Sequence, residues 1–233
     1  MTTTNNFLHK CLTEGYMMLS SGSTGPQKKL WQSVEKIQEA NRVAREVQDI
    51  STTSRIYTVC KLDHAGGLLA QSLPAYQIGA SVEVEDFNHI RWCERINEFT
   101  HSHLTPKMAR VIAKCKQWDN LDLTGKTITC GSDRVPADTI NKFTSKGATF
   151  IANWGMTEIG PIVINKVFKP GDEAKDYQGN TIMGDICYCD WRIDEQRQLW
   201  VKSDLCIYRG WFPTGDLVEV HSECMYYIGR KDA

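Results

Sequence analysis

The segment with the clearest chemical character lies near the start of the chain, where hydroxyls, glycines and a lysine are crowded together. It reads LSSGSTGPQK and spans residues 19–28. Glycine lets backbone N–H groups come close to a phosphate, serine and threonine add donors, and lysine adds positive charge. The P-loop pattern GxxxxGK[ST] fails, because Gln27 stands at its second glycine and Lys29 follows Lys28. The segment is therefore either a phosphate-binding loop of another kind or an ordinary surface loop.

Three later strings bring aromatic, hydroxyl, acidic and basic side chains together at short spacing. Residues 153–158 read NWGMTE and follow an apolar run, so an indole, a hydroxyl and a carboxylate lie close together. Residues 210–216 read GWFPTGD and end in an acid after a turn-like sequence, and residues 227–232 read YIGRKD. Each string indicates a binding site, and the alternative for each is an ordinary core, capping or surface role.

Helical and strand patterns alternate through the first two thirds of the chain. Ser33 is a suitable N-cap for a helix with one apolar stripe, and Thr105 followed by Pro106 is a typical helix start. Strands that alternate with helices of this size favour βαβ units. We expect strands at 56–60, 80–84, near 104, 126–130 and 148–152, and helices at 34–47, from about 63 to before 79, about 90–96, 105–116 and 137–145.

The pattern changes after about residue 165. Short alternating runs at 185–189, 198–202, 217–220 and 225–228 are separated by turn-like segments, which is typical of an antiparallel sheet. The predicted fold class is therefore α/β, with a mainly parallel βαβ sheet flanked by helices and a smaller strand-rich antiparallel subdomain after it. Ligands of such sheets bind where loops leave the carboxyl ends of strands, and residues 131–133 and 155–158 are predicted at such ends.

Composition excludes several other classes of protein. The 233 residues include 27 Lys plus Arg and 28 Asp plus Glu, so the chain is neither a polybasic nucleic-acid wrapper nor an acidic tail. The nine cysteines form no CxxC pair, which favours buried free thiols. His101 and His103 have the spacing of a metal pair, but core or solvated histidines are the favoured interpretation. No apolar run approaches the about 18 residues of a membrane span, and a cytoplasmic protein is predicted.

The four strings, in this order, resemble the motifs of the adenylate-forming (AMP-binding) family. That family includes acyl-CoA and aryl-CoA synthetases, luciferases and peptide-synthetase adenylation domains, and its motifs read SGSTGxPK, YGxTE, GWxxTGD and GRxD. The resemblance runs from about Leu19 to Asp232. It implies ATP-dependent activation of a carboxylic acid: the carboxylate attacks the α-phosphorus of ATP, pyrophosphate leaves, and a thiol such as coenzyme A then takes the acyl group from the adenylate.

The resemblance also implies a role for each matching residue. The β- and γ-phosphates would be held by Ser21, Gly22, Ser23, Thr24, Gly25 and Lys28. Thr157 would bond the α-phosphate and Glu158 would hold Mg²⁺, with Thr157, Glu158 and Lys28 as the catalytic set. The rest of the nucleotide site would be Gly131, Ser132, Asp133, Asn153, Trp154, Gly155, Asp216 and Arg230, with the Trp154 ring on adenine and Asp216 and Arg230 on the ribose hydroxyls. The acyl site would be bordered by His64, Gly131 and Gly155.

The sequence departs from the family pattern in three places. Gln27 replaces the proline of the phosphate loop, and Trp154 replaces the usual tyrosine. The chain is also much shorter than a typical member. We expect an α/β nucleotide- and acyl-binding region at 1–165, a strand-rich subdomain at 166–228 and a hinge remnant at 229–233, with the family's small lysine-bearing C-terminal domain absent.

Two functions therefore remain open. The first is an acid–thiol ligase of the acyl-CoA synthetase type. The second is a nucleotide- or acyl-binding protein with little or no turnover, because the lysine domain is missing. A P-loop phosphotransferase is the least favoured alternative.

The expected partners are a small carboxylic acid and either a second copy of the chain or a separate C-terminal-domain polypeptide, with no nucleic acid and no membrane span.

Overall fold

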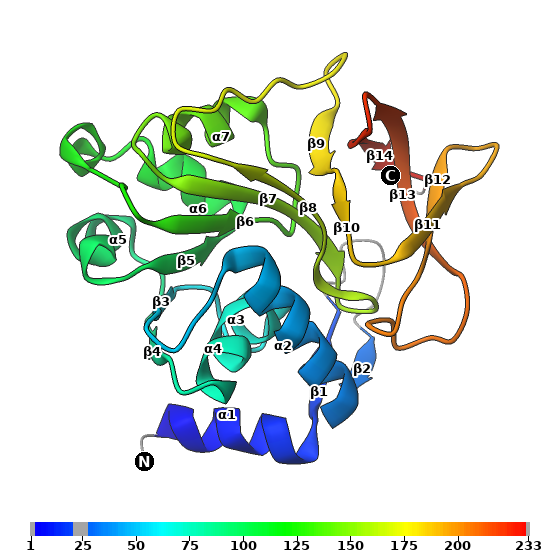
Figure 1. The fold of residues 1–233 in the computed structure, drawn as a ribbon, viewed down its shortest axis with the longest axis horizontal. Coiled ribbons are helices and arrows are strands. Elements are labelled where there is room, and N and C mark those ends of the chain that lie inside the picture. The colour runs from blue at the N-terminus through cyan, green and yellow to red at the C-terminus, as the bar shows by residue number, and fades with distance from the viewer. Residues whose placement is uncertain (1–2, 21–27, 232–233) are drawn as a thin grey trace.

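The computed structural model describes residues 3–20 and 28–231, which form a larger sheet, a smaller sheet, a two-stranded hairpin and two groups of helices (Figure 1). Ser21, Gly22, Ser23, Thr24 and Gly25 of the predicted phosphate loop lie outside the described residues, as does Asp232, so their roles stay predictions.

The larger sheet has seven strands in the order β10-β8-β7-β6-β5-β3-β4. The pairs from β4 to β7 are parallel, and β8 and β10 add two antiparallel pairs at one edge. The strands are β3 (Arg55–Thr58), β4 (Ser81–Val84), β5 (His101–Leu104), β6 (Thr127–Cys130), β7 (Thr149–Met156), β8 (Gly160–Phe168) and β10 (Ile186–Cys187). This confirms the predicted α/β class with its mainly parallel sheet.

Helices cover both faces of this sheet. Neighbouring residues of β3 show it: Ile56 packs in one apolar cluster with Ile50 and Ala75, while Tyr57 packs in another with Trp92. The first face carries α1 (Thr3–Glu14), α2 (Val34–Gln48), α3 (Ala65–Gly67), a π-helical turn (Leu68–Ser72) and α4 (Leu73–Gln77). The second carries α5 (His89–Arg95), α6 (Pro106–Ile112) and α7 (Ala137–Thr144) (Figure 1).

The predicted helix starts are confirmed by the capping bonds. The Ser33 hydroxyl accepts from the backbone N–H of Lys36, and the Thr105 hydroxyl accepts from that of Met108. The second of these helices is shorter than predicted. It ends at Ile112 instead of near 116, because Cys115 is extended and begins a separate 3₁₀ turn over Lys116–Asn120.

The smaller sheet is entirely antiparallel and has the order β11-β12-β13-β14-β9. Its strands are β9 (Thr181–Gly184), β11 (Asp190–Ile193), β12 (Gln198–Lys202), β13 (Phe212–His221) and β14 (Cys224–Arg230). One predicted strand is placed differently. The run 185–189 was expected in this sheet, but β10 pairs with β8 of the larger sheet, because Ile186 and Cys187 lie opposite Asn165 and Ile164.

A hairpin that the sequence pattern did not predict carries the hydroxyl-rich segment. It pairs β1 (Tyr16–Leu19) with β2 (Lys29–Gln32), so Met17 lies opposite Trp31. Two hydrogen bonds close its end: Ser20 N–H donates to the Lys28 carbonyl at 2.9 Å, and Lys28 N–H donates to the Ser20 hydroxyl at 2.9 Å. These bonds fix Ser20 and Lys28 against each other at the end of the hairpin.

Two further expectations concern the thiols and the membrane. All nine cysteines are free; six of them are buried and three are partly buried, as predicted. Within residues 3–20 and 28–231, none of the helices combines the length and the apolar character that crossing a bilayer requires.

Trp92 at the centre of the larger core provides a test of this fold. Its ring is fully buried, and its indole N–H donates to the Ser102 hydroxyl at 3.0 Å, which in turn donates to the Tyr57 carbonyl at 2.9 Å. Trp92→Phe removes a buried bond and leaves a void, so we expect the free energy of unfolding to fall by about 2–3 kcal/mol. Trp31→Phe, at a half-exposed ring, should change it by less than about 0.5 kcal/mol. Urea unfolding of both variants measures the difference, and equal midpoints would contradict the placement of Trp92.

Candidate functional site

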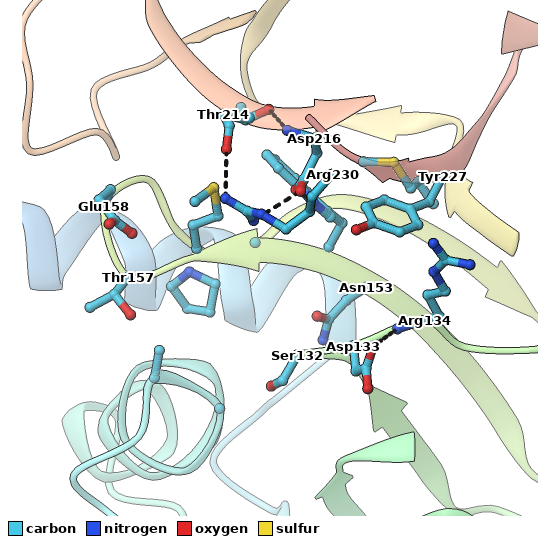
Figure 2. A pocket seen from close by; sticks show the side chains of 18 of the residues that line it. Ser132, Asp133, Arg134, Asn153, Thr157, Glu158, Thr214, Asp216, Tyr227 and Arg230 are labelled. Atoms are coloured by element: carbon cyan, nitrogen blue, oxygen red, sulfur yellow. Dashed lines mark hydrogen bonds and ion pairs between the residues drawn. The ribbon is translucent and has the colours of Figure 1, made fainter. Parts of the chain in front are cut away.

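A crevice of about 820 Å³ lies between the carboxyl edge of the larger sheet and the smaller sheet. It receives side chains from the ends of β5, β6 and β7, from the start of α3 and from β9, β12, β13 and β14. Figure 2 shows those of Asn153, Asp216 and Arg230 among others. Lys28, Glu158 and Asp216 all line it, although they are far apart in the sequence. The central geometric expectation of the sequence analysis, that these three side chains share one crevice, is therefore met.

Most of the other predicted site residues that the structure describes also line the crevice. Gly131 does not, and its structural role is to let β6 approach β7. A Cβ atom at Gly131 would lie 2.0 Å from the Asn153 side-chain oxygen, so no larger residue fits there. The predicted residues in the lining are Lys28, His64, Ser132, Asp133, Asn153, Trp154, Gly155, Thr157, Glu158, Asp216 and Arg230.

Thr157 and Glu158 lie at the tip of a hairpin. β7 runs to Met156, four residues beyond the predicted strand end, and a tight turn then leads into β8. The two strands come so close that a Cβ atom at Gly155 would lie 2.5 Å from the Gly160 carbonyl. Trp154 and Gly155 are thus strand residues, and only the Thr-Glu pair belongs to the turn.

The turn is held from two other parts of the chain. Gln32 of β2, which is buried, donates its side-chain N–H to the Thr157 carbonyl at 3.1 Å. Ile207 donates its backbone N–H to the Glu158 carbonyl at 2.9 Å. Among the described residues, none donates a hydrogen bond to the Glu158 carboxylate or pairs with it as an ion. The backbone of Glu158 is thus held in place, while the two oxygens of its carboxylate remain available to a ligand.

Asp216 is the most enclosed acid of the crevice. It lies inside β13, directly opposite Arg230 of β14, and not after a turn as predicted. Arg230 donates to one carboxylate oxygen at 2.9 Å and the Trp154 indole N–H donates to the other at 2.8 Å. Burial raises the pKa of Asp216, while the charge of Arg230 and the Trp154 bond act in the opposite direction. Figure 2 shows the pair of Asp216 and Arg230. Through Trp154, Asp216 joins the smaller sheet to β7 of the larger one.

Two histidines of the crevice wall are held neutral. The His64 ring nitrogen Nδ1 caps α3 by accepting from the Gly66 backbone N–H at 3.1 Å, and burial lowers the pKa of His64. Burial lowers the pKa of His103 to about 3, so it is neutral near pH 7. The amide of Asn153 faces His103 Nε2 at 3.3 Å and therefore donates to it, and Nδ1 faces the Cys60 sulfur at 3.6 Å. Both rings therefore present polar but uncharged surface.

The other histidine of the suspected pair belongs to the core. His101 Nε2 lies 2.9 Å from the Gln48 carbonyl, and its Nδ1 lies 2.7 Å from the Thr100 hydroxyl. Among the residues described, no cluster of three or more His, Cys, Asp or Glu side chains suits a metal ion. His101 is thus a core residue, as the favoured interpretation has it, whereas His103 is buried at the crevice wall.

Several lining residues were not identified from the sequence. Arg134 stacks over the Tyr227 ring at 4.9 Å and donates to the Ile228 carbonyl at 3.1 Å, so it ties the loop after β6 to β14. A signal for both was present in the sequence. Arg134 directly follows Asp133 of the predicted nucleotide site, and Tyr227 is the first residue of the YIGRKD string. His103 was interpreted as a core or solvated histidine, with a metal ligand as the alternative, although its position at the end of a predicted strand was a usable signal for the crevice.

Comparison with known proteins defines the class to which this site belongs. The family model described as "AMP-binding enzyme" matches residues 15–208. A feruloyl-CoA synthase from Amycolatopsis is 28% identical over 160 residues, which are 64% of this chain and 31% of that protein. An indoleacetate–CoA ligase from Aromatoleum aromaticum is 29% identical over 250 aligned residues, covering 95% of this chain and 47% of that protein. The chain belongs to the AMP-binding enzyme family, and it spans about a third to a half of the length of these relatives.

Solved structures agree on the fold. The ATP-bound MatB of Rhodopseudomonas palustris superimposes with a TM-score of 0.77 at 16% identity, over 94% of this chain and 48% of that one. The O-succinylbenzoate coenzyme A synthetase of Bacillus subtilis, solved with AMP, gives 0.74 at 19% identity, over 94% and 50%. The arrangement of two sheets around a crevice is thus that of adenylate-forming enzymes.

The buried His103 makes stability depend on pH. An unfolded histidine takes up a proton near pH 6.5, whereas folded His103 does so only near pH 3. Below pH 6.5 the unfolded chain therefore binds one more proton, and His103 contributes a fall in the free energy of unfolding of about 1.4 kcal/mol per pH unit. In His103→Asn this contribution is absent, so the decline between about pH 6 and pH 4 should be less steep. Urea unfolding across this range measures it. His9→Asn, at an exposed histidine, is the control, and equal slopes in the two variants would contradict the prediction.

Proposed function

We propose that this chain carries the nucleotide- and acid-binding part of an ATP-dependent carboxylic acid–thiol ligase of the acyl-CoA synthetase type. The observation that carries the proposal is the single crevice that Lys28, Glu158 and Asp216 share in a member of the AMP-binding family. Such chemistry needs charge neutralisation and in-line positioning more than a protein nucleophile. The crevice offers an open carboxylate, a lysine and an enclosed acid at separate points of its wall.

The nucleotide would lie along the β7–β13–β14 side of the crevice. Asp216 and Arg230 would bond the ribose hydroxyls, the Trp154 ring would pack on adenine, and residues 131–133 would border the base. Lys28, with Ser21–Gly25 of the loop that it ends, would hold the β- and γ-phosphates. The position of Lys28 supports this, because Lys28 lines the crevice and is bonded to Ser20 at the end of the hairpin.

The Thr157–Glu158 turn would meet the α-phosphate and the magnesium ion. The Thr157 hydroxyl would bond an α-phosphate oxygen. Mg²⁺ prefers carboxylate oxygens and keeps substrate phosphates and waters as its other ligands, so one open carboxylate at a fixed turn fits it. When bound, the ion would neutralise charge on the phosphate oxygens during the displacement. Glu158 would supply its protein ligand.

The acid would occupy the end that His64 and His103 line. Both rings are neutral, so a tail without charge fits there, and the reacting carboxylate would point towards the Thr157–Glu158 turn. In the first step a carboxylate oxygen bonds the α-phosphorus and pyrophosphate leaves. In the second, a thiolate sulfur bonds the acyl carbon and AMP leaves. The feruloyl and indoleacetate relatives are named for coenzyme A, which supports that thiol as the acceptor.

A second candidate is a nucleotide- or acyl-binding protein with little turnover. It is favoured by one observation, that the chain spans about half of the indoleacetate–CoA ligase it resembles. In the full-length enzymes of the family, acyl transfer depends on contacts along the whole chain. A chain of about half that length need not contain all of them. A cytoplasmic location is part of either proposal.

Exchange of labelled pyrophosphate into ATP, with a panel of aryl and acyl acids, separates the two candidates. The ligase predicts acid-dependent exchange that falls by about 10²–10³-fold in Lys28→Ala and in Glu158→Gln, because each removes a contact to developing charge. Lys29→Ala and Glu195→Gln change an exposed lysine and an exposed glutamate outside the crevice lining, so they are matched controls. Both should keep exchange within about twofold. ATP binding without exchange would instead establish the binding protein, and the absence of both would overturn the proposal.

The exposed face of the β1–β2 hairpin supports a further part of the proposal, that a second copy of the chain covers it. Met17, Leu19 and Trp31 are 44%, 48% and 50% exposed and share that face. Burying one large apolar side chain is worth about 1.5–3 kcal/mol, so Trp31→Gln should weaken self-association about tenfold or more. Trp191→Gln, at a 41% exposed ring on β11, is the control. Sedimentation velocity across micromolar concentrations measures it, and a wild-type monomer throughout would contradict it.

A further inference from the structure

The indole of Trp154 is placed to do more than present an aromatic face. Trp154 is half-buried on β7, and its N–H donates to Asp216 Oδ2 at 2.8 Å, while Arg230 donates to Oδ1 at 2.9 Å. Each carboxylate oxygen thus has one protein donor. An ionised carboxylate has about four acceptor positions, two on each oxygen, so one position remains on each.

That pattern of occupied positions suits a vicinal diol. Two adjacent hydroxyls can donate to the two remaining positions, one on each oxygen, only if the carboxylate cannot rotate. A carboxylate held by Arg230 alone could turn about its Cβ–Cγ bond, because a single donor fixes a single oxygen. The indole N–H, which comes from a different sheet, removes that rotation. The bond therefore pre-orients the acceptor before any ligand arrives.

We propose that Trp154 is a positioning residue for Asp216, and that its indole N–H orients the carboxylate for the two ribose hydroxyls of the nucleotide. The proposal rests on the proposed function in that the ligand is a nucleotide. It adds a role that an aromatic ring without an N–H at this place cannot fill. The ring face remains available for the base, so the two roles do not compete.

The environment of Asp216 predicts how this role depends on pH. The titratable or charged groups about it are Arg230 and Tyr227 of β14, with Arg134 beyond the Tyr227 ring. Burial raises the pKa of Asp216, and the Arg230 charge and the Trp154 bond both lower it. Without the indole donor the pKa rises further, so more of the carboxyl is protonated at a given pH and has lost acceptor positions. The effect of removing the donor is thus larger at lower pH.

Trp154→Phe keeps an aromatic ring and removes the donor. The probes are ATP with Mg²⁺ and 2′,3′-dideoxy-ATP with Mg²⁺, which differ only in the ribose hydroxyls. Isothermal titration should give a preference of the wild type for ATP over the dideoxy compound, and this preference should shrink at least about fivefold in Trp154→Phe. A loss of affinity that is equal for both compounds would overturn the proposal, since it would show a role in base packing or folding alone.

A second indole–carboxylate bond in the chain supplies the matched control. The Trp200 N–H donates to Asp194 at 2.9 Å, and neither residue lines the crevice. Trp200→Phe removes the same kind of bond and should leave the preference for ATP unchanged, and a decrease equal to that of Trp154→Phe would also overturn the proposal.

A measurement without nucleotide separates this proposal from the proposed function. Carbon-13 NMR of the aspartate carboxyls, with Asp216 assigned by Asp216→Asn, should show Asp216 titrating at higher pH in Trp154→Phe than in the wild type. If the wild type binds no ATP while this shift is seen, the proposed function fails and the link from Trp154 to Asp216 holds. If Asp216 titrates identically in both proteins, the positioning role is wrong whatever the nucleotide does.

Discussion

One enclosed carboxylate joins the two sheets on which this crevice is built. The Asp216 side chain is 5% exposed, and its two donors come from different sheets, Arg230 from β14 and Trp154 from β7. Taking a charge out of water costs several kcal/mol unless its oxygens are well paired, so a shift of one sheet against the other would leave this charge uncompensated. The apolar cluster of β8, β12, β13 and β14 supplies most of the cohesion, but such packing is not directional. The hydrogen bonds of Asp216 therefore favour one relative position of the two sheets, which apolar packing alone does not select.

The remaining parts of the site are brought to this crevice by topology. Parallel strands end at one edge of a sheet, so the ends of β5, β6 and β7 lie together although about 50 residues separate the first from the last. The β1–β2 hairpin is not part of that sheet, and it is attached through the bond from Gln32 to the Thr157 carbonyl. Gln32 thus connects β2 to the turn that carries Glu158. Under the proposed function, Lys28 at the end of this hairpin and Glu158 would be linked through one buried side chain.

The sequence was sufficient to predict the fold and the site residues where a local pattern decides the structure. Capping by Ser33 and Thr105 and the alternation of elements identified the α/β class, and the four motif strings identified residues that share one crevice. It was insufficient where distant packing decides. The pattern of Ile186 and Cys187 predicted another strand of the antiparallel region. In the structure they pair with β8 instead, at the edge of the larger sheet. The hairpin of β1 and β2 was missed because four residues on each side carry too little periodicity. The Trp154 bond to Asp216 spans 62 positions, and no spacing rule predicts a contact of that kind.

The distribution of charge in the crevice bears on how an acid would be oriented under the proposed function. Lys28, Arg134, Arg230 and the carboxylates of Asp133, Glu158 and Asp216 line it, whereas burial keeps the rings of His64 and His103 neutral. A carboxylate placed against neutral, desolvated rings would lose its hydration with no compensating charge, whereas beside Lys28 it would gain one. An apolar tail has the opposite preference. A carboxylic acid bound as proposed would therefore favour one direction, with its reacting group next to the turn of Thr157 and Glu158 and its tail against the two histidines.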